Sequence, residues 1–167
     1  MSNINNIPLR TCRVCGIHAF SKEELNLFVT SSRNKHGKLN QCKDCTNKRN
    51  RERRKKNPFH YLCLAKKSEC KRKQIPFNLT DIYLKKLWKK QGGLCILSGL
   101  KMEKPYNESD FDWVASLDRI QFDKGYVKGN VRWIINAINT LKRQKDDAFV
   151  YKIAQAIVNH NDLHHNS

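Results

Sequence analysis

The chain has 167 residues, enough for one modest hydrophobic core and a small additional module. Its 33 Lys and Arg residues against 15 Asp and Glu give a formal net charge of +18 at pH 7. Such an excess opposes compaction, and its usual explanation is a polyanionic partner, most often nucleic acid. No apolar run approaches the ~20 residues of a membrane-spanning helix, and residues 1–10 lack the apolar stretch of a signal peptide. We therefore expect a cytoplasmic protein with no membrane partner.

Four of the seven cysteines form two CxxC pairs, Cys12 with Cys15 and Cys42 with Cys45. The thiols of one CxxC turn point toward a common position, and two such turns can complete a tetrahedral zinc site. A redox motif would instead need one CxxC within a βαβ unit, and the sequence shows none. In a reducing cytosol, metal binding is also a more frequent use of cysteine than a disulfide. We predict one structural zinc ion, with a hairpin turning at Gly37 before the second pair.

Residues 46–57, TNKRNRERRKKN, contain neither Gly nor Pro and predict a helix that ends before Pro58. A merely solvated helix would mix both signs of charge, whereas Glu52 is the only acid here. We therefore predict contacts with DNA phosphates, which position a protein without reading base sequence. The predicted DNA-binding residues are Lys48, Arg49, Arg51, Arg53, Arg54, Lys55 and Lys56.

The middle of the chain predicts a helix over residues 59–73, a short strand over 75–79, and a helix capped by Thr80 or Asp81 that stops at Gly92. Residues 146–161 predict an amphipathic helix that packs back on the core. The residues expected to face the core are Tyr61, Leu62, Ala65 and Cys70 in the first helix, and Ile82, Leu84, Leu87 and Trp88 in the second. The remaining cysteines, Cys63, Cys70 and Cys95, are expected to be buried small residues and not metal ligands.

Two stretches carry a family resemblance: GGLCILSGLKM (92–102) and SLDRIQFDKGYVKGNVRWIINAINTLK (116–142). They resemble the HNH endonucleases, also called ββα-metal or His-Me finger nucleases, in a branch frequent in bacteriophage genomes with the pattern SLDRI…GY…GNV…N…K. The resemblance implies an α+β protein with a four-cysteine zinc module, a ββα-metal nuclease core and flanking helices. It places the zinc module and basic linker in residues 1–57 and the nuclease domain in residues 58–167.

In this family a magnesium or similar ion is held by an aspartate and a final histidine or asparagine, which correspond here to Asp118 and Asn139. Both offer the oxygen ligands that a hard cation prefers. The resemblance also implies that Asn130 holds the loop between the strands, and that Asp118 ends the first strand. The expected reaction is hydrolysis of DNA phosphodiester bonds, most simply in double-stranded DNA.

Two positions depart from the family pattern. The usual general base is a histidine directly after the metal aspartate, and Arg119 stands there. Arginine stays protonated and can only clamp the phosphate, so the base would be Tyr126 or a hydroxide generated by the metal ion. Many HNH enzymes carry two further CxxC pairs that bind a zinc ion around the nuclease core. Here Ser98 stands three positions after Cys95, where such a pair would need cysteine, so we expect no second zinc ion.

The rival hypothesis is a non-catalytic, zinc-containing nucleic-acid-binding protein with a degenerate HNH fold, because the same basic surface would serve binding alone. The sequence leaves open whether the chain forms a homodimer. If the protein is phage-encoded, its expected location is the host cytoplasm.

Overall fold

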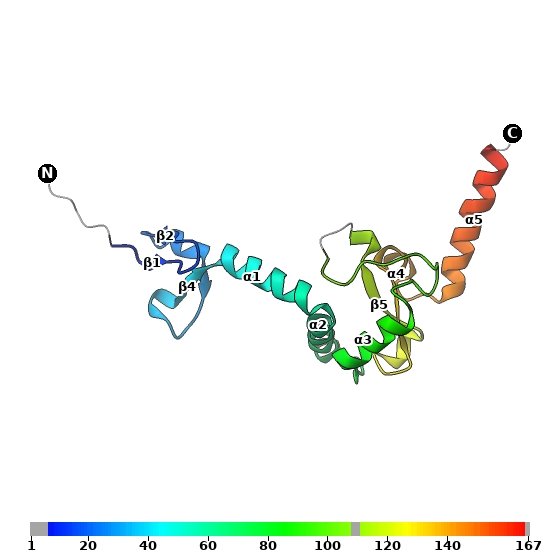
Figure 1. Ribbon diagram of the computed structural model, residues 1–167, viewed down its shortest axis with the longest axis horizontal. Coiled ribbons are helices and arrows are strands. Elements are labelled where there is room, and N and C mark those ends of the chain that lie inside the picture. The colour runs from blue at the N-terminus through cyan, green and yellow to red at the C-terminus, as the bar shows by residue number, and fades with distance from the viewer. Residues whose placement is uncertain (1–6, 108–110, 166–167) are drawn as a thin grey trace. The chain divides into compact units, whose positions relative to one another are not determined.

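The computed structural model describes residues 7–107 and 111–165 (Figure 1). The chain divides into two compact units, Met1–Arg53 and Arg54–Ser167. Small two-stranded sheets and helices make up a mixed α+β protein, as expected from the sequence. Within the described residues, no helix has both the length and the apolar character that a membrane span needs.

The first unit contains two antiparallel pairs of strands. The pairs are β1 (Arg10–Thr11) with β2 (His18–Ala19), and β3 (Phe28–Thr30) with β4 (Lys38–Cys42). A short 3-10 turn joins β3 to β4 and ends at Gly37, whose φ of 65° is accessible to glycine at little cost, so the predicted hairpin is confirmed. The small core of this unit consists of Cys12, Ala19, Leu25, Phe28 and Cys42.

Two helices follow the second CxxC pair in close succession. Helix α1 (Lys43–Lys56) has no buried residue and ends before Pro58, as predicted, and α2 (Pro58–Lys73) starts one residue earlier than predicted. After this proline, Phe59 and Cys70 are the buried apolar side chains of α2, and Leu62 packs against the same core as Phe59. The core-facing side of α2 is therefore the one that carries Phe59 and Leu62. Ala65 lies off this side and is exposed, so the prediction that Ala65 faces the core was wrong.

Helix α3 (Asp81–Lys90) begins as predicted, because the Thr80 hydroxyl accepts a hydrogen bond from the backbone N–H of Tyr83. Leu84 is fully buried and Trp88 packs against the same core. Ile82 is exposed, contrary to the prediction, because a residue two positions from Leu84 lies on the opposite side of a helix. The strand expected over residues 75–79 is reduced to a single bridge between Phe77 and Tyr126.

A β-hairpin followed by a helix forms the centre of the second unit. Strand β5 (Ala115–Arg119) pairs antiparallel with β6 (Val131–Ile135), and α4 (Asn136–Lys142) follows β6 directly (Figure 1). Leu117 and Trp133 are paired across the two strands and both are buried. Trp133 also contacts Phe59 and Trp88 edge-on, which joins the hairpin to α2 and α3 in one aromatic core.

The outer edge of β6 is covered by a side chain. The Gln91 amide nitrogen donates to the carbonyl of Trp133 at 2.9 Å, and its amide oxygen accepts from the N–H of Trp133 at 2.9 Å. The two bonds reproduce the pattern that a neighbouring strand would make at this position. Gln91 follows α3 directly, so the end of that helix is fastened to the sheet.

Helix α5 (Asp147–His165) is longer than predicted but packs less. Val150 is buried in its first turn, whereas Ile157 and Val158 are 58% and 51% exposed. The expectation that the whole amphipathic helix packs back on the core was therefore wrong beyond the first turns. The apolar residues in the later turns of α5 lie beyond the end of the small core, and none of those described packs against it.

Candidate functional site

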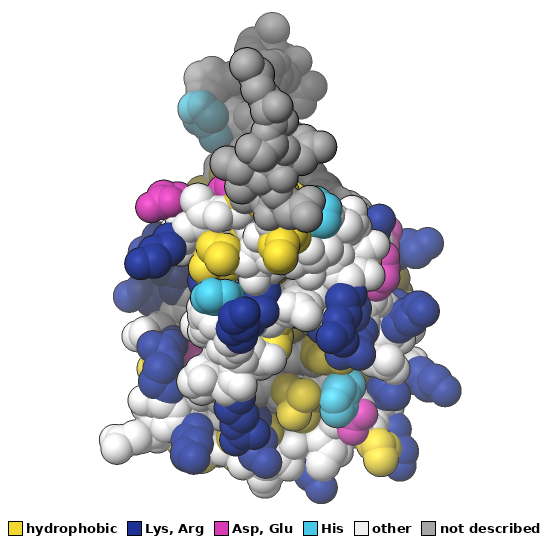
Figure 2. Space-filling view, turned by 90° about the vertical axis from the view of Figure 1, so that its left-hand side faces the viewer, with side chains coloured by type: hydrophobic (Ala, Val, Ile, Leu, Met, Phe, Trp, Pro, Cys, Tyr) yellow, Lys and Arg dark blue, Asp and Glu magenta, His cyan; other side chains and the backbone are white. Residues whose placement is uncertain are grey.

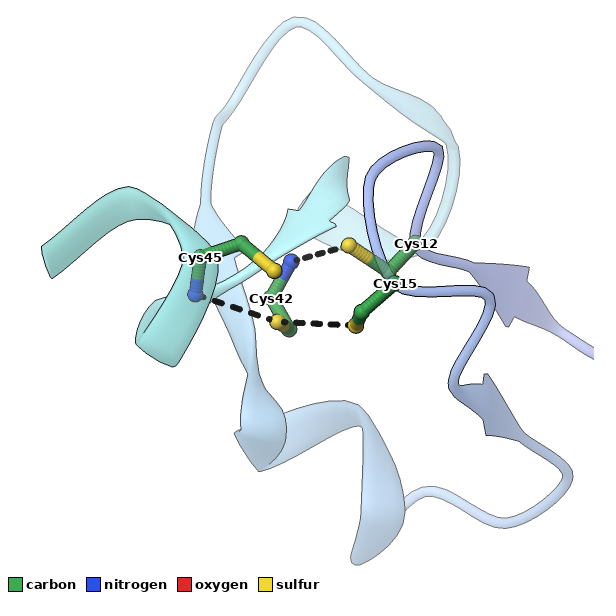
Figure 3. Close-up of side chains that lie close together, drawn as sticks. All are labelled: Cys12, Cys15, Cys42 and Cys45. Atoms are coloured by element: carbon green, nitrogen blue, oxygen red, sulfur yellow. Dashed lines mark hydrogen bonds between the residues drawn. The ribbon is translucent and has the colours of Figure 1, made fainter. Parts of the chain in front are cut away.

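The four cysteines of the two CxxC pairs come together in the first unit, as predicted (Figure 3). The Sγ atoms of Cys12, Cys15, Cys42 and Cys45 all lie within 4.8 Å of one another. The turn after β1 supplies one pair, and the end of β4 with the first turn of α1 supplies the other. Four sulfur ligands at this spacing could hold one structural zinc ion.

The backbone around the cysteines is also arranged for thiolates. The N–H of Cys42 donates to Cys12 Sγ at 3.3 Å, and the N–H of Cys45 donates to Cys42 Sγ at 3.4 Å (Figure 3). Burial opposes ionisation of Cys12, but hydrogen bonds from the backbone outweigh it and lower the pKa of that thiol to about 6. Hydrogen bonding with the Cys42 and Cys15 thiols raises the pKa of Cys45 to about 12. One negative charge among the four sulfurs thus disfavours a second, and a divalent cation would remove that repulsion.

The predicted DNA-binding side chains on α1 are all exposed. One of them, Arg54, belongs to the second unit and lies with its guanidinium 5.6 Å from the ring centroid of Tyr106. On the face of the molecule shown in Figure 2, Lys and Arg side chains are spread widely and acidic side chains are sparse. On this face, positive charge is therefore displayed on the surface with few acids to neutralise it.

Four of the five residues predicted for catalysis line one small cavity in the second unit. Asp118 and Arg119 come from the end of β5, Tyr126 from the loop that follows, and Asn139 from α4. The cavity has a volume of about 40 Å³, which is room for an ion or for very few water molecules. The basic residues Lys142, Arg143 and Lys145 also line it.

Asp118 is 4% exposed and is held by two cations. Lys142 Nζ donates to both carboxylate oxygens at 3.0 and 3.1 Å, and Arg132 Nε donates to Oδ2 at 2.9 Å. Arg132 also forms two hydrogen bonds with Asp147, and the bond from Arg132 is the main cause of the lowered pKa of that carboxyl. The network contains two acids and two bases, so its formal charges cancel.

The other cavity residues are held by their neighbours. The Asn139 amide nitrogen donates a hydrogen bond to Ser116 Oγ at 2.7 Å. This leaves the amide oxygen to act as a ligand for a cation. Arg119 donates to the carbonyl of Phe122 at 2.8 Å. The Tyr126 ring centroid lies 5.1 Å from the Arg119 guanidinium and 5.2 Å from Lys66 Nζ, so two cations flank it.

Asn130 lies at the end of the loop between β5 and β6, and its side chain makes three hydrogen bonds to the loop backbone. Oδ1 accepts from the N–H of Gln121 at 2.9 Å, and Nδ2 donates to the carbonyls of Gln121 and Gly125 at 2.8 Å each. Gly125 adopts a φ of 76°, and a Cβ there would lie 2.5 Å from the carbonyl oxygen of Pro76. Glycine and asparagine thus fix the path of the loop that carries Tyr126.

Asn130→Ala is expected to lower the free energy of unfolding of the second unit by about 2–3 kcal/mol, because three hydrogen bonds are lost at a buried position. Asn130→Asp keeps the acceptor and should lose less. Asn78→Ala is the control, since it removes one hydrogen bond to Lys128 at an exposed position. All three tryptophans lie in the second unit, so denaturant titration followed by tryptophan fluorescence measures this unit alone. Equal stability of Asn130→Ala and Asn78→Ala would show that Asn130 does not hold the loop.

The donor set of the cavity fits a hard divalent ion, because a carboxylate and an amide oxygen are the ligand types that such an ion takes. Asp118 is, however, the only carboxylate among the described residues that line the cavity. A cation placed there would compete with Lys142 for the Asp118 oxygens. An anionic phosphate beside the ion would offset part of the positive charge that the ion adds to the network.

Several residues of this site were not assigned a role from the sequence. Lys142 is the final lysine of the SLDRI…N…K pattern, and its three-residue spacing from Asn139 on a helix could have placed both on one face. Arg132, two residues after Asn130, could not have been matched to Asp118 without the strand register. Lys66 lies far from the pattern in sequence, and no local signal indicates its contact with Tyr126.

Comparison with protein-family models, curated proteins and solved structures gave no significant match to this chain.

Proposed function

We propose that the protein is a divalent-metal-dependent DNA endonuclease of the HNH type, with the cavity around Asp118 as its active site. The observation that carries the proposal is the convergence of Asp118, Arg119, Tyr126 and Asn139 on one small, positively charged cavity. These residues come from a hairpin and the helix directly after it, which is the order that the family resemblance implies. Phosphodiester hydrolysis needs oxygen ligands for a cation and fixed positive charge for the phosphate, and the cavity offers both.

Each side chain has a role consistent with its contacts. Asp118 and the amide oxygen of Asn139 would hold a magnesium or similar ion, which when bound neutralises charge on the phosphate and on the departing 3′ oxygen. Arg119 would bind the nonbridging phosphate oxygens. Tyr126 would orient the attacking water and, in its phenolate form, would accept the proton of that water. Asn130 would keep Tyr126 in place through the loop backbone.

The zinc module and α1 would serve binding in this proposal. The four-cysteine site fixes the start of α1, and the exposed Lys and Arg residues along that helix would contact phosphates of double-stranded DNA. Such contacts add affinity without sequence preference, so any choice of target would depend on other surfaces.

The direct test is incubation of supercoiled plasmid with purified zinc-loaded protein, with and without added magnesium. We expect nicked or linear product only when magnesium is present. Omission of magnesium is preferable to a chelator, because a chelator would also attack the zinc site. Intact plasmid at every magnesium and manganese concentration would contradict the enzymatic proposal.

One observation favours the rival function, a non-catalytic nucleic-acid-binding protein. The Asp118 carboxylate is already neutralised by Lys142 and Arg132, so the network is complete without a metal ion. In that case Asp118 serves only stability, and plasmid would be bound and retarded in a gel but not cut.

A further inference from the structure

A second hollow in the Arg54–Ser167 unit is lined by lysines and by no acidic residue that the structure describes. Its volume is about 570 Å³. The end of α1, helix α3 and the segment after Lys101 supply the basic side chains. These lysines are Lys55, Lys56, Lys85, Lys86, Lys89 and Lys104.

The floor of this lysine hollow is apolar. Pro58, Phe59 and Trp88 line it, and the Phe59 and Trp88 rings are 5.8 Å apart between centroids. Trp88 is held on its other side by Trp133 of the core. Ile82, which is exposed although it is a large apolar residue, also lines the hollow. The lysines therefore stand around an apolar surface whose aromatic rings are packed against one another.

Apart from Lys55, the lysines of the hollow form no ion pair with an acidic residue that the structure describes. Among described residues, no ion pair involves Lys56, Lys85, Lys86, Lys89 or Lys104. Elsewhere in the same unit the fold does supply acids: Glu69 pairs with both Lys73 and Lys66, and this lowers the pKa of Glu69 to about 2. Crowded, uncompensated ammonium groups repel one another, so a partner that brings negative charge is favoured at this position.

We infer that the lysine hollow binds the sugar–phosphate backbone of duplex DNA, as a contact separate from the cavity around Asp118. Phosphates would lie among the ammonium groups, and Ile82 and Trp88 would pack against the sugars. A neighbouring hollow of about 520 Å³ shares Lys55, Trp88 and Lys104 and adds Lys101 beside one acid, Glu103, so its described lining is still net basic. The inference rests on the proposed binding of DNA but not on cleavage.

The experiment compares two triple variants that remove the same charge from exposed helical positions of one unit. The hollow variant is Lys85→Ala, Lys86→Ala, Lys89→Ala, and the control variant is Lys67→Ala, Lys71→Ala, Lys152→Ala, whose residues lie outside the hollow. Binding of a fluorescent DNA duplex is followed by anisotropy from about 50 to about 300 mM salt, with no divalent metal added, so that cleavage does not interfere. A third variant, Lys85→Arg, Lys86→Arg, Lys89→Arg, keeps the positive charge and tests whether charge determines the affinity for DNA.

Loss of three phosphate contacts should lower the slope of log affinity against log salt by about 2–3 in the hollow variant and weaken binding about tenfold or more at about 100 mM salt. The control variant should keep a slope close to the parent, and the arginine variant should bind as the parent does. Equal slopes for the hollow and control variants, with a parent that binds DNA, would overturn the inference alone. A parent that does not bind duplex DNA would contradict the proposed function as well.

Discussion

Cys42→Ser is expected to abolish zinc binding and to unfold the first unit, while the second unit keeps its fold. The purified parent should contain one zinc ion per chain, because the described cysteines form one four-sulfur cluster. The core of the first unit is very small, and two of its five buried residues, Cys12 and Cys42, belong to the four-cysteine cluster that could hold zinc. Structural zinc contributes about 10–16 kcal/mol in small zinc-dependent folds, which is comparable to the whole stability of a typical domain.

Metal content by mass spectrometry and the far-ultraviolet circular dichroism spectrum measure the two expected losses. Tryptophan fluorescence should show an unchanged denaturation transition, since the first unit contains no tryptophan. Cys63→Ser is the matched control: it makes the same chemical change at a half-buried cysteine outside the cluster. Two tightly bound zinc ions in the parent, or one zinc retained by Cys42→Ser, would show that the site is misassigned.

Asp118→Asn is expected to reduce DNA cleavage on the order of a hundredfold or more, because a neutral amide gives a cation and its phosphate much less stabilisation than a carboxylate does. The substitution also has a structural consequence. It leaves Lys142, which is 3% exposed, without its main counter-charge, and breaking a buried ion pair in this way costs about 3–5 kcal/mol. Loss of activity in the single variant therefore does not by itself identify a metal ligand.

The double variant Asp118→Asn, Lys142→Gln separates the two roles. It removes one charge of each sign, so we expect the stability of the second unit to recover part of the loss while cleavage stays abolished. Supercoiled plasmid reports cleavage, tryptophan fluorescence reports stability, and a gel shift without magnesium should show DNA binding close to that of the parent. Cleavage at the parental rate by a folded Asp118→Asn protein would exclude Asp118 from the chemistry.

The local features of the sequence were predictive where one short segment determines the structure. The two CxxC pairs come together because each turn presents its thiols by itself, and Thr80 caps α3 through a hydrogen bond within one turn. The end of the helix before Pro58 follows in the same way from the fixed geometry of proline, whereas its start lies three residues before the predicted one. These predictions needed no knowledge of the tertiary structure.

Predictions that depended on distant partners were weaker. The segment at 75–79 has the composition of a strand, but Phe77 is its only residue in a β-bridge among the described residues. The loop approaches Pro76 at Gly125 and does not run along the whole segment. The pairing of Asp118 with Lys142 joins β5 to α4 and depends on how the helix lies against the hairpin. For that reason the sequence could identify Asp118 as a candidate ligand but could not show that a buried lysine already binds it.

The bond pair between Gln91 and Trp133 has a consequence for how the protein behaves at high concentration. An open strand edge is a template on which a second chain can add its own strand, and a two-stranded sheet has proportionally more such edge than a wide one. The Gln91 amide closes the edge of β6 at the buried Trp133, and the N–H of Ile96, in the loop after α3, also donates to the Trp133 carbonyl at 3.3 Å. We therefore expect Gln91, together with the loop through Ile96, to leave less of this edge open to a second chain, which concerns solubility and not the chemistry of the cavity.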